Sequence, residues 1–210
     1  MRVRPISPAA LVEALADRVA AAAAGRRWLR VGVDGAPAAG GAALADALVP
    51  ALRVRGRAAL RVSAGAFLRP ASLRLERGRD DPDVFYEDWL DVGGLTREVL
   101  DPLAGGGTGR VLPTLWDPVA DRATRSAYVE LAPGGVLLLD GALLLGSGLP
   151  LDFTVHLAAS AAALARRTPA DLAWTLPAYG RYAAEVGPET VADVVVRVED
   201  PRHPALVAPA

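Results

Sequence analysis

The chain has 210 residues, a formal net charge of −1, 52% hydrophobic residues and no cysteine, so disulfide and thiolate chemistry are excluded. This length fits one domain with a substantial core, and the charge balance gives no general attraction to nucleic acid or to an anionic membrane. No apolar run approaches the ~20 residues of a membrane span, so we expect a cytoplasmic protein.

The first predicted element is a helix over residues 8–24, where Leu11, Leu15 and Val19 lie on one stripe and Ser7 is a suitable N-cap. Short runs rich in Val and Leu then predict strands at 28–34, 58–63, 136–140, 152–157 and 193–198. Between them, helices are predicted at 41–53, 92–103, 159–167 and 177–186.

Apolar strands that alternate with helices are typical of a parallel sheet covered on both faces. Ligands of such sheets bind beyond the carboxyl ends of the strands. That rule places Asp34, Ser63 and Asp140 around one site. The proline-rich tail over 201–210 is expected to be loosely held.

A glycine-rich turn follows the strand at 28–34 and precedes an alanine-rich helix. Gly35 and Gly40 have the spacing of a phosphate loop, but Gly41 stands where the pattern has Lys and Ala42 where it has Ser or Thr. Lysine is absent from the whole chain. Backbone N–H groups at such a helix start can still attract an anion. The alternative interpretation is an ordinary tight turn between a strand and a helix.

Several single residues allow a structural or a functional interpretation. Asp34 suits a backbone-capping role beside the loop, and His156, inside an apolar strand, suits a hydrogen-bonded core histidine. Asp140 is either a metal ligand or the cap of the next turn. The charged segment 77–83 reads as a solvated surface, or as part of a pocket wall through the aromatic residues that follow it: Phe85, Tyr86 and Trp89.

Two other enzyme classes are disfavoured. Ser63 and Ser147 lack the nucleophile-elbow context of a serine hydrolase. The glycines of the loop do not have the three-glycine spacing of a dinucleotide-binding motif.

The ordered succession of segments resembles the uridine kinase family of phosphate-loop nucleoside kinases over about residues 28–204. Its pieces are the glycine loop at 35–42 and the segments 62–67, 77–86, 101–103, 138–141, 166–167 and 192–196. The resemblance implies a three-layer α/β fold like that of P-loop NTPases, with a five-stranded parallel sheet, helices on both faces and a short lid at about 166–181. The whole chain, 1–210, would be a single domain.

The resemblance also implies ATP and Mg²⁺ as cofactors and a nucleoside- or nucleotide-sized small molecule as the ligand. Asp140 would assist Mg²⁺, and the lid arginines Arg166 and Arg167 would lie near the transferred phosphate. The implied phosphate-binding residues are Gly35, Ala38, Ala39, Gly40, Gly41 and Ala42. The implied substrate-binding residues are Ser63, Phe67, Asp80, Phe85, Trp116, Asp117 and Arg181.

This chain departs from the family pattern at the catalytic positions. The family reads Val-Ser-x-Asp-Asp-Phe after the second strand, and Gly65 and Ala66 replace the two aspartates here. Losing one electrostatic stabiliser of a transition state costs roughly 10²–10³ in rate, and a cation, a hydroxyl and a base are all missing. We therefore expect impaired phosphoryl transfer with a retained pocket. The alternatives are an active nucleoside kinase that uses arginines as its cations, or a non-catalytic interaction protein; a homo-oligomer is left open.

Overall fold

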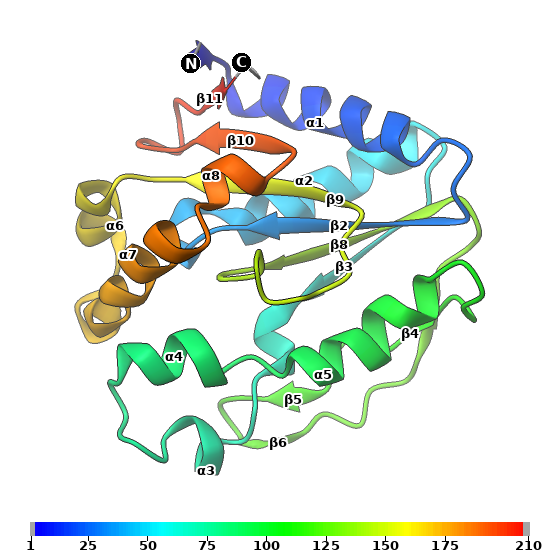
Figure 1. Cartoon of the computed structure of the whole chain (residues 1–210). Helices are drawn as coiled ribbons and strands as arrows, with labels where there is room; N and C mark the ends of the chain where they lie inside the picture. The colour runs from blue at the N-terminus through cyan, green and yellow to red at the C-terminus, as the bar shows by residue number, and fades with distance from the viewer. Residues whose placement is uncertain (1–2, 208–210) are drawn as a thin grey trace.

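A seven-stranded sheet forms the centre of the protein in a computed structural model that describes residues 3–207 (Figure 1). Its order is β1-β11-β10-β9-β2-β8-β3, and the five strands from β10 to β3 run parallel. Each coincides with a predicted apolar run, which confirms the expected five-stranded parallel sheet. The five are β2 (Trp28–Asp34), β3 (Ala59–Ser63), β8 (Gly135–Gly141), β9 (Phe153–Ala158) and β10 (Val194–Arg197).

The sheet is wider than expected because both ends of the chain join it. The strands β1 (Val3–Pro5) and β11 (Ala205–Val207) pair with each other, and β11 pairs with β10, all antiparallel. The tail expected to be loose from residue 201 is thus held in the sheet as far as Val207, because the apolar side chains of Leu206 and Val207 are buried. Residues 208–210 of that tail lie outside the described residues.

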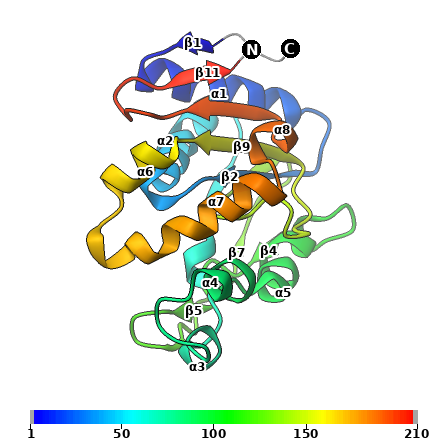
Figure 2. The ribbon, with the colours of Figure 1, turned by 60° about the vertical axis from the view of Figure 1, so that its left-hand side comes forward.

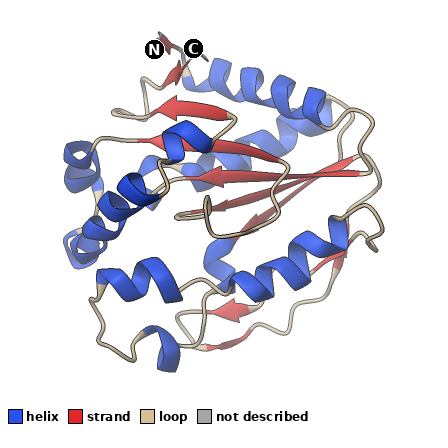
Figure 3. Cartoon of the chain, in the orientation of Figure 1, coloured by secondary structure: helices blue, strands red, loops and turns tan. Residues whose placement is uncertain are grey.

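Helices cover the two faces of the sheet (Figure 3). One face packs against α1 (Pro8–Ala22) and α2 (Gly41–Val54). The other packs against the segment that starts as α5 (Val92–Leu95) and continues as a π turn and a 3-10 turn to Leu103. The chain after β9 forms α6 (Ala161–Arg167), a 3-10 turn (Ala170–Thr175), α7 (Leu176–Glu185) and α8 (Pro188–Val191).

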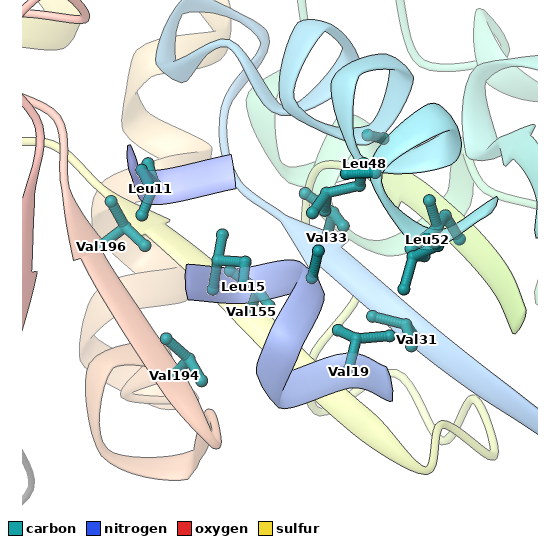
Figure 4. Close-up of a cluster of buried hydrophobic side chains, with 14 of the residues drawn as sticks. Leu11, Leu15, Val19, Val31, Val33, Leu48, Leu52, Val155, Val194 and Val196 are labelled. Carbon is teal, nitrogen blue, oxygen red and sulfur yellow. The ribbon is translucent and has the colours of Figure 1, made fainter. Parts of the chain in front are cut away.

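The first helix follows the pattern read from the sequence. The Ser7 hydroxyl accepts a hydrogen bond from the N–H of Ala10 at 3.3 Å, and Pro8 occupies a position where no N–H is needed. Leu15 and Val19 are fully buried against the strands β2, β9 and β10 (Figure 4). The amphipathic stripe therefore becomes the core on this face of the sheet.

Between β3 and β8, the segment 92–103 is helical as predicted, but the other short elements were not predicted. They include α3 (Ala71–Arg74) and α4 (Pro82–Asp88), which lie away from the sheet (Figure 2). Two small antiparallel sheets pair β4 (Arg110–Val111) with β7 (Val129–Glu130) and β5 (Trp116–Asp117) with β6 (Arg122–Ala123). Within residues 3–207, no helix is both long and apolar enough to cross a membrane.

A half-buried ion pair joins β2 to the loop that precedes β9. The Nε and Nη2 atoms of Arg30 donate to the Asp152 carboxylate at 2.8 and 2.9 Å, and the Arg30 backbone N–H adds a third bond at 3.0 Å. Burial opposes ionisation of this carboxyl, but the bonds from Arg30 outweigh it and hold the pKa of Asp152 below its ordinary value of 3.8.

We expect this ion pair to make stability depend on acid. The pKa of Asp152 is lower in the folded state than in the unfolded state. The ion pair therefore stabilises the fold at pH values above the unfolded-state pKa of ~4, and this stabilisation is lost as the pH falls through the folded-state pKa. Urea unfolding of Asp152→Asn should show a shallower loss of stability below pH 4 than the parent. The exposed Asp171→Asn serves as the control, and parallel pH profiles for Asp152→Asn and the parent would contradict the assignment.

Candidate functional site

Polar side chains gather at the carboxyl ends of three neighbouring strands. Ser63 of β3 pairs in register with Asp140 of β8, and Asp34 of β2 lies between Gly141 of β8 and His156 of β9. The loops beyond these ends enclose a cavity of about 560 Å³. It is the larger of two adjoining cavities and is called the main cavity below.

The glycine loop closes one side of the main cavity. Gly40 has a φ of +87°, in the left-handed region where glycine is favoured, and it caps the start of α2. A Cβ at Gly35 would lie 3.0 Å from Leu157 Cβ and 3.1 Å from the Leu157 carbonyl oxygen, so glycine is favoured there. The loop therefore keeps the two glycines that a phosphate loop needs.

Much of the loop's own donor capacity is used internally. Pro37 has no N–H, and the N–H groups of Ala39 and Gly40 donate to the carbonyls of Ala36 and Pro37 at 2.7 and 3.1 Å. The first N–H groups of a helix have no partner within it, so the amides at Gly41 and Ala42 remain for a ligand. Both residues line the main cavity.

Asp140 is held by an arginine that the sequence patterns did not single out. Arg61 of β3 donates from Nε and Nη2 to the two carboxylate oxygens of Asp140 at 2.7 and 3.0 Å. Its Nη1 also donates to Asp46 on α2 at 3.0 Å. Asp140 is only 4% exposed, so this bidentate pair occupies both of its oxygens and raises the pKa of Arg61.

The residues present do not fit a Mg²⁺ ion of the expected kind. Mg²⁺ takes oxygen ligands in near-octahedral geometry, but the Asp140 oxygens are bound to Arg61 and Ala42 carries no hydroxyl. Within residues 3–207, no group of three His, Cys, Asp or Glu side chains is placed to hold a metal ion. The carboxylate expected to assist a divalent cation is thus paired with a guanidinium instead.

Aromatic rings form another wall of the main cavity. Phe85 of α4 and Trp89, the residue after this helix, meet edge to face with centroids 5.2 Å apart, and their rings lie 5.6 and 5.4 Å from that of Trp174. Asp81 is the N-cap of α4, because its carboxylate accepts from the N–H groups of residues 83 and 84. This cap fixes the start of the helix and so helps to position the rings.

Arg181 of α7 forms ion pairs with carboxylates on two helices. It binds Asp83 at 3.0 Å and Glu87 at 2.8 Å on α4, and Glu185 at 2.8 Å on its own helix. Its guanidinium also lies 4.5 Å from the Tyr86 ring centroid. Hydrogen bonding to Glu185 and then to Glu87 raises the pKa of Arg181. This arginine therefore joins α4 to α7.

A buried polar cluster lies behind the glycine loop. Asp34, fully buried, accepts from the backbone N–H of Leu144 at 2.9 Å, which fits the capping role expected of it. His156 Nδ1 lies 2.6 Å from Asp34 Oδ2, so this histidine is hydrogen-bonded in the core as expected. The hydroxyl of Tyr182, which no pattern singled out, donates to the same oxygen at 3.0 Å.

The structure brings six of the predicted site residues to the main cavity and leaves the others elsewhere. Phe67 is fully buried in the core beneath the site, and Asp80 is exposed. Ala38, Ala39 and Gly40 form the loop turn but do not line the cavity. The six that line it are Gly35, Gly41, Ala42, Ser63, Phe85 and Asp140.

Trp116 and Asp117 lie in the β5–β6 hairpin outside the main cavity. Asp117 accepts from the N–H groups of Val119 and Ala120 at 2.9 and 3.0 Å, and these bonds lower the pKa of Asp117. The Trp116 indole N–H donates to Asp121 at 3.1 Å. Both side chains therefore form hydrogen bonds within the β5–β6 hairpin.

The two arginines expected in a lid differ from each other. Arg166 is exposed near the end of α6. The Nη1 and Nη2 atoms of Arg167 are buried, and neither has a hydrogen-bond partner within the described residues. Its Nε donates to the carbonyl of Ala163 at 3.3 Å. The helix α6 packs against the turn Pro37–Ala39 of the glycine loop.

Sequence reasoning missed Arg61, Glu87 and Tyr182. Arg61 is a charged residue inside a short apolar strand, and that alone is a signal because a half-buried arginine needs an acidic partner. Tyr182 carries no such signal, because a tyrosine in an amphipathic helix is normally read as core.

Comparisons with solved structures identify the fold. A possible uridine kinase from Bacillus stearothermophilus superposes with a TM-score of 0.70 at 21% identity, covering 88% of this chain and 96% of that one. A proposed fructose transport system kinase from Silicibacter sp. TM1040 gives 0.59 at 23% identity, with 86% and 94% covered. The YGR205w protein gives 0.58 at 9% identity, with 97% and 100% covered.

No family model and no curated protein matches the sequence. At these identities the likeness shows the fold, and it confirms the three-layer α/β arrangement like that of P-loop kinases that the resemblance implied.

Proposed function

We propose that this chain is a uridine-kinase-like protein that has lost efficient ATP-dependent phosphoryl transfer and keeps a pocket for a nucleoside-sized molecule. The observation that carries the proposal is the bidentate pair between Arg61 and Asp140. This pair engages the carboxylate at the end of β8. In addition, the glycine loop has Gly41 in place of the lysine and Ala42 in place of the hydroxyl residue of a phosphate loop.

The walls of the main cavity support an uncharged ligand. Among the described residues 3–207, the charged ones that line it are Glu87 and Asp140, and no arginine does. A triphosphate there would have backbone amides of α2 as donors but no cation, whereas kinase chemistry is mostly positioning and charge stabilisation around the phosphates. The aromatic wall suits a flat ring with polar substituents.

Titration calorimetry with uridine and with ATP, each with and without Mg²⁺, tests this function. We expect uridine to bind, Mg²⁺ to leave its affinity unchanged, and no uridine monophosphate to form. Ala42→Phe, which projects into the main cavity, should abolish binding. Ala43→Phe, on the same helix turn but outside the cavity, should not.

Two outcomes would contradict the proposal. Failure of both uridine and ATP to bind at millimolar concentration would favour a protein that acts through its surface alone. Turnover that disappears in Arg167→Ala would favour an active kinase. One observation supports that second candidate: the buried Nη1 and Nη2 atoms of Arg167 have no partner within residues 3–207 and so are free to donate to a phosphate, and α6 packs against the glycine loop.

A further inference from the structure

A second cavity of about 260 Å³ adjoins the main cavity. The two share Gly35, Leu143 and Tyr182 as a common wall. His156 lines only the smaller one and is 7% exposed. The function of the main cavity does not account for this site, and the inference below does not depend on the function proposed above.

The donors and acceptors around Asp34 show which atom carries the proton in its hydrogen bond to His156. The Tyr182 hydroxyl accepts from the N–H of Leu145 at 3.0 Å, so its single proton goes to Asp34. Burial, and then the charge of Asp34, raise the pKa of Tyr182 and keep it a phenol. Asp34 as a carboxylate only accepts, so His156 Nδ1 must carry the proton in the 2.6 Å bond between them.

The other ring nitrogen, Nε2, takes no part in this cluster. A neutral imidazole that is protonated at Nδ1 has a lone pair at Nε2. Within residues 3–207, Nε2 has no hydrogen-bond partner, and it is not among the side-chain atoms sealed from solvent. An oriented ring nitrogen that no protein group satisfies, on a residue that lines a cavity, is suited to hydrogen-bond a ligand there.

The remaining polar groups of the smaller cavity are also mainly acceptors. Glu189 brings a carboxylate whose charge is balanced on its far side by Arg197 at 3.2 Å. The Thr190 hydroxyl donates to the carbonyl of Gly187 at 2.7 Å, so towards a ligand its oxygen can only accept a hydrogen bond. No arginine lines the cavity, and Tyr179 adds an aromatic wall; burial raises the pKa of Tyr179 to about 12.

We infer that His156 is a neutral imidazole protonated at Nδ1, and that the smaller cavity binds a small neutral polyhydroxyl compound of pentose size, one hydroxyl of which donates to Nε2 of His156. Acceptors from β9 and from α8 match several hydroxyl donors. Aromatic faces suit the apolar face of a sugar ring. The absence of a lining cation disfavours a phosphorylated ligand.

Histidine NMR with D-ribose as the probe tests this inference, because the chain contains just two histidines. The ¹⁵N signals of His156 should show the neutral Nδ1-protonated form near pH 7.5 and should move on addition of ribose. His203, whose side chain is 79% exposed, is the internal reference and should not move. Ribose should also slow acylation of His156 by diethyl pyrocarbonate by about tenfold at ten times its dissociation constant.

Matched substitutions at the rim place the ligand without touching the core. Ala183 and Ala184 are both exposed on α7, but only Ala183 lines the smaller cavity. Ala183→Phe should abolish the ribose response, whereas Ala184→Phe should preserve it. The inference is overturned if millimolar ribose leaves the His156 signals unchanged, if Nε2 carries the proton, or if Ala183→Phe binds ribose like the parent.

Discussion

The variant Gly41→Lys, Ala42→Ser, Gly65→Asp, Arg61→Met is expected to phosphorylate uridine at least about 10²-fold faster than the variant with the first three changes alone. Those three return the missing cation, hydroxyl and base. They leave Asp140 bound to Arg61, however, so its carboxylate is not free for Mg²⁺. Releasing Asp140 from Arg61 should therefore raise the phosphorylation rate above that of the threefold variant.

The backbone has room for these side chains. A Cβ at position 41 would lie 3.7 Å from the carbonyl oxygen of Val33, and one at position 65 would lie 3.5 Å from the Ser63 hydroxyl. Both are ordinary contact distances. Formation of uridine monophosphate measures the rate, and a rise in melting temperature with Mg²⁺ in the fourfold variant alone gives an independent readout.

Arg53→Met in the threefold background is the control, because Arg53 also reaches β3, at the carbonyl of Ala59, but does not contact Asp140. It should leave the rate unchanged. Equal rates for the threefold and fourfold variants would show that the arginine pair does not obstruct the site.

Replacing Asp34 by alanine is expected to lower the free energy of unfolding by about 3–5 kcal/mol. The change leaves the Leu144 N–H, the Tyr182 hydroxyl and the His156 Nδ1–H without their acceptor in a buried site. Asp34→Asn keeps one carbonyl oxygen and should cost less.

Urea unfolding measures these free energies. Asp171→Ala, on an exposed turn, should stay within about 0.5 kcal/mol of the parent. A loss below about 1 kcal/mol for Asp34→Ala would mean that the three donors find other partners, and the cluster would then not be a rigid unit.

The sequence predicted the parallel sheet because its central strands are largely buried, so each is a short run rich in Val, Leu or other apolar residues. The strand-end rule likewise placed Asp34, Ser63 and Asp140 at one edge, and their registers agree. These predictions succeed because they rest on local composition and on a general property of such sheets.

The failures involve partners distant in sequence. Arg61 and Asp140 are 79 residues apart, and Tyr182 and Asp34 are 148 apart, so no local pattern reports either pair. The helix α4 is a different case. Asp81 followed by Pro82 is a helix-start signal, but the surrounding charges led us to read the segment as a solvated surface or a pocket wall.

The pairing of β1 with β11 has a practical consequence for experiments on this molecule. Val3 and Val207 are register partners, so both ends of the described chain emerge together (Figure 1). They do so at the sheet edge opposite β3. A fluorophore or affinity handle at either end would report on the molecule without crowding the two cavities, and a short peptide bridge between the ends would allow the chain to be opened at a surface loop instead.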